Sequence, residues 1–289
     1  MLAPLAATLA IPAALHIAWR VRHGYPPEGF PRVLCFHKIS ARFCLEGTWT
    51  TPRRLAATVD RLQARGWRFI GEDEYLAALD GAPDPASRRV WLTFDDGYAH
   101  LLDSARPILA QRGVPWHVFM VTDYAGRANT WDLSLGRPAS RHLDWNEVHD
   151  LAAAGVTFGS HTAAHHDVTT VGAAELAADL ARSRDALAGV TGRVPRTLSY
   201  PFGRYNDAAR AAVVAAGYRA AFSLYPHGRN DAVDRYALRR DAVYIIDPVW
   251  GVETKLVRNP LFGLEEMKCR AINGVARLTP LLKKSAGVG

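Results

Sequence analysis

Short apolar runs alternate along most of the chain with segments in which apolar residues recur every three or four positions. The runs are typical of buried strands, and the segments are typical of amphipathic helices. This alternation predicts parallel strands joined by crossover helices, and so an α/β fold that is either a barrel or an open doubly wound sheet. The predicted strands are Val33–His37, Val90–Phe94, Trp116–Val121, Thr157–Ser160, Thr197–Tyr200 and Tyr218–Ser223, and the predicted helices are Pro52–Arg65, Ala99–Arg112, Trp145–Ala154, Ala173–Ala188 and Asp207–Ala216.

The N-terminal segment departs from this pattern. No Asp, Glu, Lys or Arg occurs between Met1 and Trp19, and Arg20 and Arg22 follow at once. At about 1.5 Å per residue, an apolar helix of this length just spans a bilayer. A secretory signal would carry its positive charges before the apolar run. We therefore expect a membrane anchor at residues 1–20, with a buried or peripheral helix as the alternative.

The formal net charge of +7 is dispersed over the chain. Dispersed positive charge is typical of a solvated surface, and attraction to acidic lipids is the second interpretation. The sequence has no zinc-finger spacing or other nucleic-acid module, so we expect no nucleic-acid partner, and no obligate protein partner is evident. Residues 248–289 read as a basic amphipathic tail that either lies on an anionic membrane or packs back onto the main domain.

A pair of carboxylates follows one predicted strand. Asp95 and Asp96 stand between the apolar run ending at Phe94 and Gly97, where the chain can turn. Adjacent carboxylates at the end of a strand repel each other unless a cation or a proton lies between them. The alternative for a single aspartate is an N-cap of the next helix. The pair together with the glycine favours a functional role.

Two histidines follow another predicted strand. His161 and His165 are four residues apart, a separation at which two imidazoles can bind one metal ion. Surface histidines are the alternative for such a pair taken alone. Combined with the carboxylates on another strand of the same sheet, the pair predicts an Asp-His-His metal site. Three protein ligands leave positions open for water and substrate, which a catalytic metal requires.

The sequence resembles the NodB-type polysaccharide deacetylases, also called carbohydrate esterase family four. Thr93–Gly97 matches the first motif of that family, and His161–His165 matches the second. Ser199–Gly203 is similar to the third motif, and Leu143–Trp145 is similar to a segment that precedes the second motif. The resemblance covers residues 31–247. It implies a distorted (β/α) barrel, a divalent metal that is usually zinc, and removal of N-acetyl groups from sugars.

The resemblance also implies roles for individual residues. Asp96, His161 and His165 would be the metal ligands, and Asp95 would be the catalytic base. The candidates for contact with the sugar are Tyr200, Pro201, Phe202 and Trp131, with burial in the core as the alternative for these aromatic residues.

Two features depart from the usual pattern of the family. The arginine that shortly precedes the proline of the third motif is not at its usual position, and whether Arg196 reaches the site is left open. Arg240 is the candidate replacement as partner of Asp95, with a surface arginine as the alternative. The late Leu-X-His motif is missing near the C-terminus. His37, after the first predicted strand, is similar to the histidine of a circularly permuted exopolysaccharide deacetylase subgroup, so we expect His37 to be the general acid rather than a structural histidine.

These residues predict a metal-dependent hydrolase that removes N-acetyl groups from a polysaccharide or a lipid-linked saccharide. One alternative is a deacylase or deformylase of another N-acyl substrate. A second alternative is a non-catalytic carbohydrate-binding protein, although the predicted ligands and Asp95 are all present. The third is a membrane scaffold, for which a metal site would serve no purpose.

The predicted anchor leads to an expected orientation. Positive flanks stay on the cytoplasmic side of a membrane, so Arg20 and Arg22 predict that the main domain faces the cytoplasm. Three dispersed cysteines, Cys35, Cys44 and Cys269, fit reduced thiols in a reducing compartment, although one disulfide pair stays open. A periplasmic or extracellular domain is the alternative.

A reporter fusion tests this orientation. A phosphatase that is active only in the periplasm, fused to the C-terminus, should be inactive in intact bacterial cells. The control is the same fusion behind a cleavable secretory signal, which should be active. Activity of the first fusion would place the domain outside the cytoplasm.

Overall fold

The computed structural model describes residues 29–42, 48–84, 86, 88–130, 139–224, 233–257, 265, 267, 268 and 272. The expected anchor at residues 1–20, Trp131 and most of the expected tail lie outside these residues. Within the described ranges, no helix is both long enough and apolar enough to cross a bilayer.

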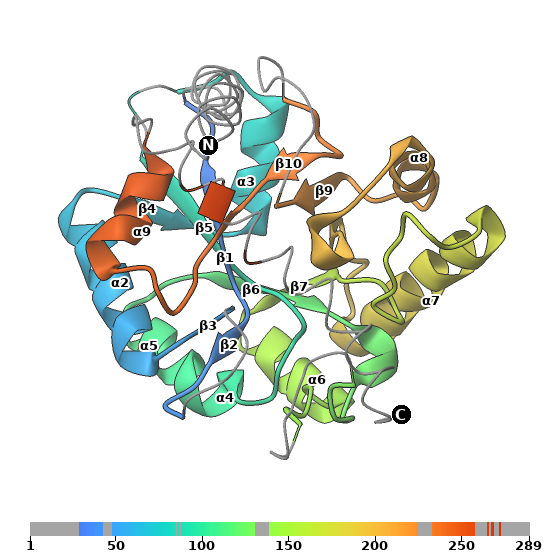
Figure 1. Ribbon diagram of the computed structural model, residues 1–289, viewed down its shortest axis with the longest axis horizontal. Coiled ribbons are helices and arrows are strands. Elements are labelled where there is room, and N and C mark those ends of the chain that lie inside the picture. Colours follow the sequence, from blue (N-terminus) through green and yellow to red (C-terminus); the bar gives the residue numbers. More distant parts are fainter. Residues whose placement is uncertain are drawn as a thin grey trace, which may run out of the picture.

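A sheet of nine parallel strands forms the centre of the described structure (Figure 1). Its order is β10-β9-β8-β7-β6-β5-β1-β11, and β4 also pairs with β5. A separate parallel pair consists of β2 (Lys38–Ile39) and β3 (Trp49–Thr50). The strands of the large sheet are β1 (Arg32–Phe36), β4 (Arg68–Ile70), β5 (Arg89–Phe94), β6 (Trp116–Met120), β7 (Thr157–Ser160), β8 (Thr197–Ser199), β9 (Ala220–Ser223), β10 (Leu238–Arg239) and β11 (Asp241–Ala242).

Helices lie around the outside of these strands (Figure 1). The apolar faces of these helices pack on the sheet. Each strand and helix predicted from the sequence has a counterpart in the structure. The helices are α2 (Pro52–Ala64), α3 (Glu72–Asp80), α4 (Leu101–Ser104), α5 (Arg106–Gln111), α6 (Trp145–Ala153), α7 (Ala173–Thr191), α8 (Asp207–Ala215) and α9 (Val249–Leu256), with short 3₁₀ turns η1 (Thr122–Tyr124) and η2 (Pro201–Gly203).

One extended stretch near the C-terminal end brings the two edges of the sheet together. β10 pairs with β9, and β11, one residue later, pairs with β1 on the other edge. Arg240 lies between the two short strands and donates its backbone N–H to the Ser223 carbonyl at 3.1 Å. This stretch therefore bridges both edges, and of the two predicted α/β architectures the structure has the (β/α) barrel.

The interior of the barrel is aromatic, and α3 contributes to it. Tyr75 of α3 stacks on Trp91 with ring centroids 4.9 Å apart, and its ring lies 5.5 Å from that of Phe222. These side chains belong to one buried cluster that also includes Phe119. The sequence pattern did not predict β4 or α3, because both are short and α3 begins with three acidic residues.

The helix predicted at Ala99–Arg112 is instead two short helices, α4 and α5. Pro107 lies at the start of α5. Proline has no N–H to donate, and its ring collides with the carbonyl of the preceding turn, so one continuous helix cannot pass through this position. Residues 249–256, assigned from the sequence to the tail, form α9, whose Val252 and Leu256 pack in the same core as Leu55 of α2.

Gly159 in β7 tests how tightly the barrel is packed. A Cβ at this position would lie 2.6 Å from His117 Nε2 and 2.7 Å from the Phe119 ring. We expect Gly159→Ala to lower the free energy of unfolding by about 1–3 kcal/mol through overpacking. In the matched control Gly189→Ala the new Cβ meets no atom within 4 Å, and this variant should gain up to about 1 kcal/mol from helix propensity. Thermal unfolding of both variants measures the difference, and equal melting temperatures would contradict the packing argument.

Candidate metal and catalytic centre

The chemically distinctive side chains lie at one end of the barrel. Asp95 and Asp96 follow β5, His37 follows β1, and His161 follows β7. β1 pairs with β5, and β5, β6 and β7 are successive neighbours, all parallel. The carboxyl ends of these strands therefore meet at the same edge, where βα barrels hold their active sites.

Asp96, His161 and His165 form a buried group. Asp96 Oδ1 lies 3.6 Å from His161 Nε2 and 3.5 Å from His165 Nε2. One ligand atom from each of the three residues lies within 4.8 Å of the other two. The side chains that the sequence assigned to one metal ion therefore converge.

Hydrogen bonds fix the direction in which this group faces. His161 Nδ1 lies 2.7 Å from the Ser199 carbonyl, which can only accept, so Nδ1 carries the proton and Nε2 turns a lone pair toward Asp96. The backbone N–H of His165 donates to Thr162 Oγ1 at 3.0 Å. Burial lowers the pKa of both imidazoles, and that of His165 is well below its usual value. Neutral imidazole is the form that binds a metal.

The spacing and chemistry of this group fit a divalent metal ion. Ligands about 2.0–2.2 Å from a tetrahedral zinc stand about 3.4 Å apart, close to the two contacts between carboxylate and imidazole. Two neutral imidazoles and one carboxylate are a ligand set found in catalytic sites that leave a position open. The three residues can therefore hold a metal ion with little movement.

Asp95 faces a different partner, Arg240. The two guanidinium nitrogens Nη1 and Nη2 each donate to one carboxylate oxygen at 2.6 Å, and both side chains are buried. Ser199 Oγ donates to Asp95 Oδ2 at 3.2 Å and accepts from Arg240 at 2.6 Å. Burial would raise the pKa of Asp95, but the charge of Arg240, with His161 and further donors, holds it well below its usual value. Asp95 is therefore a carboxylate at every physiological pH.

A second cluster of possible metal ligands adjoins the first and consists of Cys35, His37 and Asp95. Cys35 Sγ lies 3.5 Å from Asp95 Oδ2 and 4.0 Å from His37 Nδ1. Burial raises the pKa of the Cys35 thiol well above its usual value, even though Arg240 acts against this rise. Because the thiol stays protonated and both Asp95 oxygens bind Arg240, this cluster is poorly suited to a metal. Half-buried His37, directly after the neighbouring strand β1, is within reach of Asp95.

The third motif, Ser199–Gly203, exposes fewer side chains for contact with a sugar than its sequence suggested. Tyr200 is fully buried and its hydroxyl donates to the Tyr236 carbonyl at 3.0 Å, and Pro201 is buried too. Neither residue exposes a face, which agrees with the alternative of burial in the core for Tyr200, and the sugar contact of both residues stays a prediction. Phe202 is half-buried with φ 57°, and its ring centroid lies 4.8 Å from that of His165. Trp131 lies outside the described residues.

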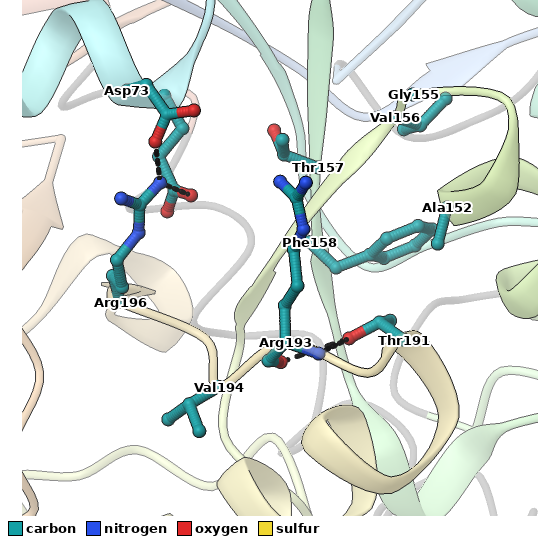
Figure 2. A pocket seen from close by; sticks show the side chains of 11 residues that line it. Asp73, Ala152, Gly155, Val156, Thr157, Phe158, Thr191, Arg193, Val194 and Arg196 are labelled. Carbon is teal, nitrogen blue, oxygen red and sulfur yellow. Dashed lines mark hydrogen bonds and ion pairs between the residues drawn. The ribbon is translucent and has the colours of Figure 1, made fainter.

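Arg196 points to the other end of the barrel. It precedes β8 and lines a cavity of about 420 Å³ together with Thr157, the first residue of β7 (Figure 2). Its guanidinium donates to Glu72 at 2.7 Å and also binds Asp73, as the dashed lines in Figure 2 show. Because the strands are parallel, this cavity lies opposite the end that carries the metal group. Arg196 therefore does not reach Asp95, and Arg240 occupies that place.

The structure also reveals a supporting residue that the sequence analysis did not select. Asp179 of α7 accepts the backbone N–H groups of Ala163 at 2.7 Å and Ala164 at 3.0 Å, inside the loop that carries both histidines. Its signal in the sequence is a carboxylate on the apolar stripe of a helix, since Leu176 and Leu180 are buried on the same face. A buried charge of this kind requires partners.

Comparison with known proteins agrees with this geometry. Residues 82–221 match the family model described as polysaccharide deacetylase. The chain is also 24% identical over 199 residues to the poly-beta-1,6-N-acetyl-D-glucosamine N-deacetylase of Staphylococcus epidermidis, a match that covers 66% of each chain. The chain is thus similar, through residues 82–221, to the polysaccharide deacetylase family. These similarities confirm the prediction of an enzyme that hydrolyses amide bonds of N-acetylated saccharides.

Two solved structures share the fold. IcaB from Ammonifex degensii has a TM-score of 0.67 and 23% identity, covering 80% of this chain and 98% of that chain. The Streptococcus pyogenes deacetylase PplD, solved in complex with acetate, has a TM-score of 0.67 and 21% identity, covering 81% of this chain and 100% of that chain. Both support the barrel predicted from the sequence.

The ion pair between Arg240 and Asp95 leads to a stability prediction for this deacetylase. Arg240→Met leaves the Asp95 carboxylate buried without its partner and should lower the free energy of unfolding by about 3–5 kcal/mol. The double variant Asp95→Asn/Arg240→Met removes both charges and should regain most of this loss. Denaturant unfolding measures both variants. A single variant as stable as the wild type would show that the pair does not constrain the fold.

The same pair predicts a dependence on pH. The folded-state pKa of Asp95 is lowered, so the pair contributes stability above the unfolded value of about 3.9, and this contribution declines as the pH falls from about 5 toward the folded-state pKa. On acidification the wild type should therefore lose stability relative to the double variant, which has no carboxylate to protonate at position 95.

Proposed function

We propose that the protein is a zinc-dependent deacetylase that removes N-acetyl groups from a polymer of N-acetylglucosamine. The observation that carries this proposal is the pairing of two sites at one edge of the barrel. One is the group of Asp96, His161 and His165, which fits a metal, and the other is an ionised Asp95 held by Arg240. A metal in the first site would bind the water and the amide carbonyl, and the carboxylate of the second site can accept a proton from that water.

The metal ligands in this proposal are Asp96, His161 and His165. A zinc ion bound to them would polarise the amide carbonyl and lower the pKa of a water molecule toward neutrality. Zinc is favoured over magnesium because two of the three ligands are imidazoles. The hydrogen bond from His161 to the Ser199 carbonyl keeps that ligand oriented before any metal arrives.

Two other side chains transfer protons. Asp95 Oδ2 lies 3.9 Å from His161 Nε2, so the carboxylate stands beside the metal group and can accept the proton of the attacking water. Arg240 keeps this carboxylate ionised and fixed in direction. His37, directly after the neighbouring strand β1, donates a proton to the departing amine nitrogen. Each such transfer is typically worth about 10²–10⁴ in rate.

The proposed substrate follows from the name of one relative and from one half-buried ring. The relative from Staphylococcus epidermidis is named for poly-beta-1,6-N-acetyl-D-glucosamine. Phe202 is half-buried beside His165, so its free face can pack on a pyranose ring that enters the site. A membrane-tethered domain facing the cytoplasm, as the sequence predicts, would instead favour a lipid-linked precursor of such a polymer.

Release of acetate tests this proposal. The zinc-loaded protein should release acetate from N-acetylglucosamine oligomers, lose activity on chelation and regain it with zinc. A panel with β-1,6 linkages, β-1,4 linkages and N-formyl sugars separates the substrate classes. Release of formate alone would favour a deformylase, and no release from any N-acylated saccharide would contradict the proposal.

Variants of single residues test the roles. Asp95→Asn and His37→Ala should each bind zinc but lose at least about 10²-fold in kcat, and Asp96→Ala should lose the metal itself. The control is His149→Ala, since His149 is exposed on α6 and its Nδ1 lies 3.4 Å from Asp150 Oδ1, away from the metal group. Full activity of His37→Ala would show that another group protonates the amine.

A further inference from the structure

A segment far along the chain holds the loop that carries the two aspartates. The backbone N–H of Leu143 donates to the Gly97 carbonyl at 2.8 Å, and the N–H of Ala99 donates to the Arg141 carbonyl at 2.9 Å. Tyr98 and His142 form an antiparallel bridge between these bonds. The capping box of α6, between Asp144 and Glu147, follows directly and anchors the segment. The loop after β5 is therefore clamped from outside the sheet.

The His142 side chain extends this clamp to Asp96. Its Nδ1 lies 2.8 Å from the Asp96 carbonyl oxygen, and the ring is fully buried. A carbonyl can only accept, so Nδ1 carries the proton and donates. The ring stacks on Tyr98 with centroids 4.9 Å apart and planes at 27°, and it lies 5.6 Å from the Tyr124 ring. The imidazole is thus held in place from its faces and aimed at one backbone atom.

The backbone of Asp96 needs such a constraint. Its φ is 69°, and that of Gly97 is 70°. The left-handed region costs a residue with a side chain about 1–2 kcal/mol, and such a conformation persists where the surrounding structure holds it. This turn directs the Asp96 carboxylate toward His161 and His165, while Asp95, one residue earlier, turns toward Arg240. A relaxed Asp96 backbone would move the carboxylate away from both imidazoles.

We infer that His142 is a positioning residue for Asp96, and that its hydrogen bond to the Asp96 carbonyl sets the metal affinity of the site. This inference rests on the proposed role of Asp96 as a metal ligand. The metal group itself consists of Asp96, His161 and His165. It acts through the peptide that joins Asp96 to Gly97.

Three substitutions separate the hydrogen bond from the shape of the ring. His142→Phe keeps the stacking on Tyr98 but removes the donor. His142→Asn places an amide N–H where Nδ1 stood, and His142→Gln places its amide further out, where Nε2 stood. The control is His149→Phe, because His149 is exposed on α6.

The primary measurement is the zinc dissociation constant, obtained by competition with a chromophoric chelator. Loss of a hydrogen bond that orients a ligand typically weakens metal binding by about 10–100-fold. We expect a loss of this size for His142→Phe and His142→Gln, values within a few-fold of wild type for His142→Asn, and no change for His149→Phe. At saturating zinc, the kcat of His142→Phe and of His142→Gln should lie closer to the wild-type value than their zinc affinities do.

Melting of the metal-free protein distinguishes positioning from general support of the fold. Equal zinc affinity in the Asn and Gln variants, or a Phe variant that is destabilised yet binds zinc as tightly as wild type, overturns the inference. Should His142→Phe fail to fold, the difference in zinc affinity between His142→Asn and His142→Gln tests the inference. If the wild-type protein binds no divalent metal, the proposed function is wrong, and the inference about His142 is wrong with it because it depends on that function.

Discussion

The buried ion pair between Arg240 and Asp95 is the interaction on which both the barrel and its chemistry depend. Arg240 lies where the stretch from β10 to β11 changes its pairing from β9 to β1, and its side chain crosses to the end of β5. Its guanidinium also packs over the Phe119 ring at 5.1 Å. Burying two charges is costly, and two parallel hydrogen bonds offset part of that cost. One contact thus joins the closing stretch to the central strand.

This pair explains why the adjacent residues Asp95 and Asp96 have different chemical roles. Because both oxygens of Asp95 bind Arg240, that carboxylate is fixed, ionised and poorly placed to ligate a metal. Asp96 follows with φ 69°, which swings its carboxylate to the opposite side, toward His161 and His165. The backbone turn therefore separates a proton acceptor from a metal ligand over the length of one residue.

The order of the strands in space differs from their order in the sequence. This difference brings residues that are distant in the sequence together in the site. β1 begins the barrel, yet it pairs with β5 on one side and β11 on the other. His37 consequently lies beside Asp95 although 58 positions of the chain separate them. Arg240 arrives from the far end of the domain to complete the same site. A parallel barrel makes this possible because every strand presents its carboxyl end at the same edge.

The sequence by itself determined the strands near Asp95 and His161 and the two motifs that follow them. These features are local, since a buried strand needs a continuous apolar run and ligands on one loop need a short spacing. Only the tertiary structure decided that Arg240 rather than Arg196 faces Asp95, that Tyr200 belongs to the core, and that His142 reaches Asp96. Each of these outcomes depends on which strand ends and loops meet in space. Periodicity cannot carry that information, because partners 36 to 145 residues apart leave no local pattern in the chain.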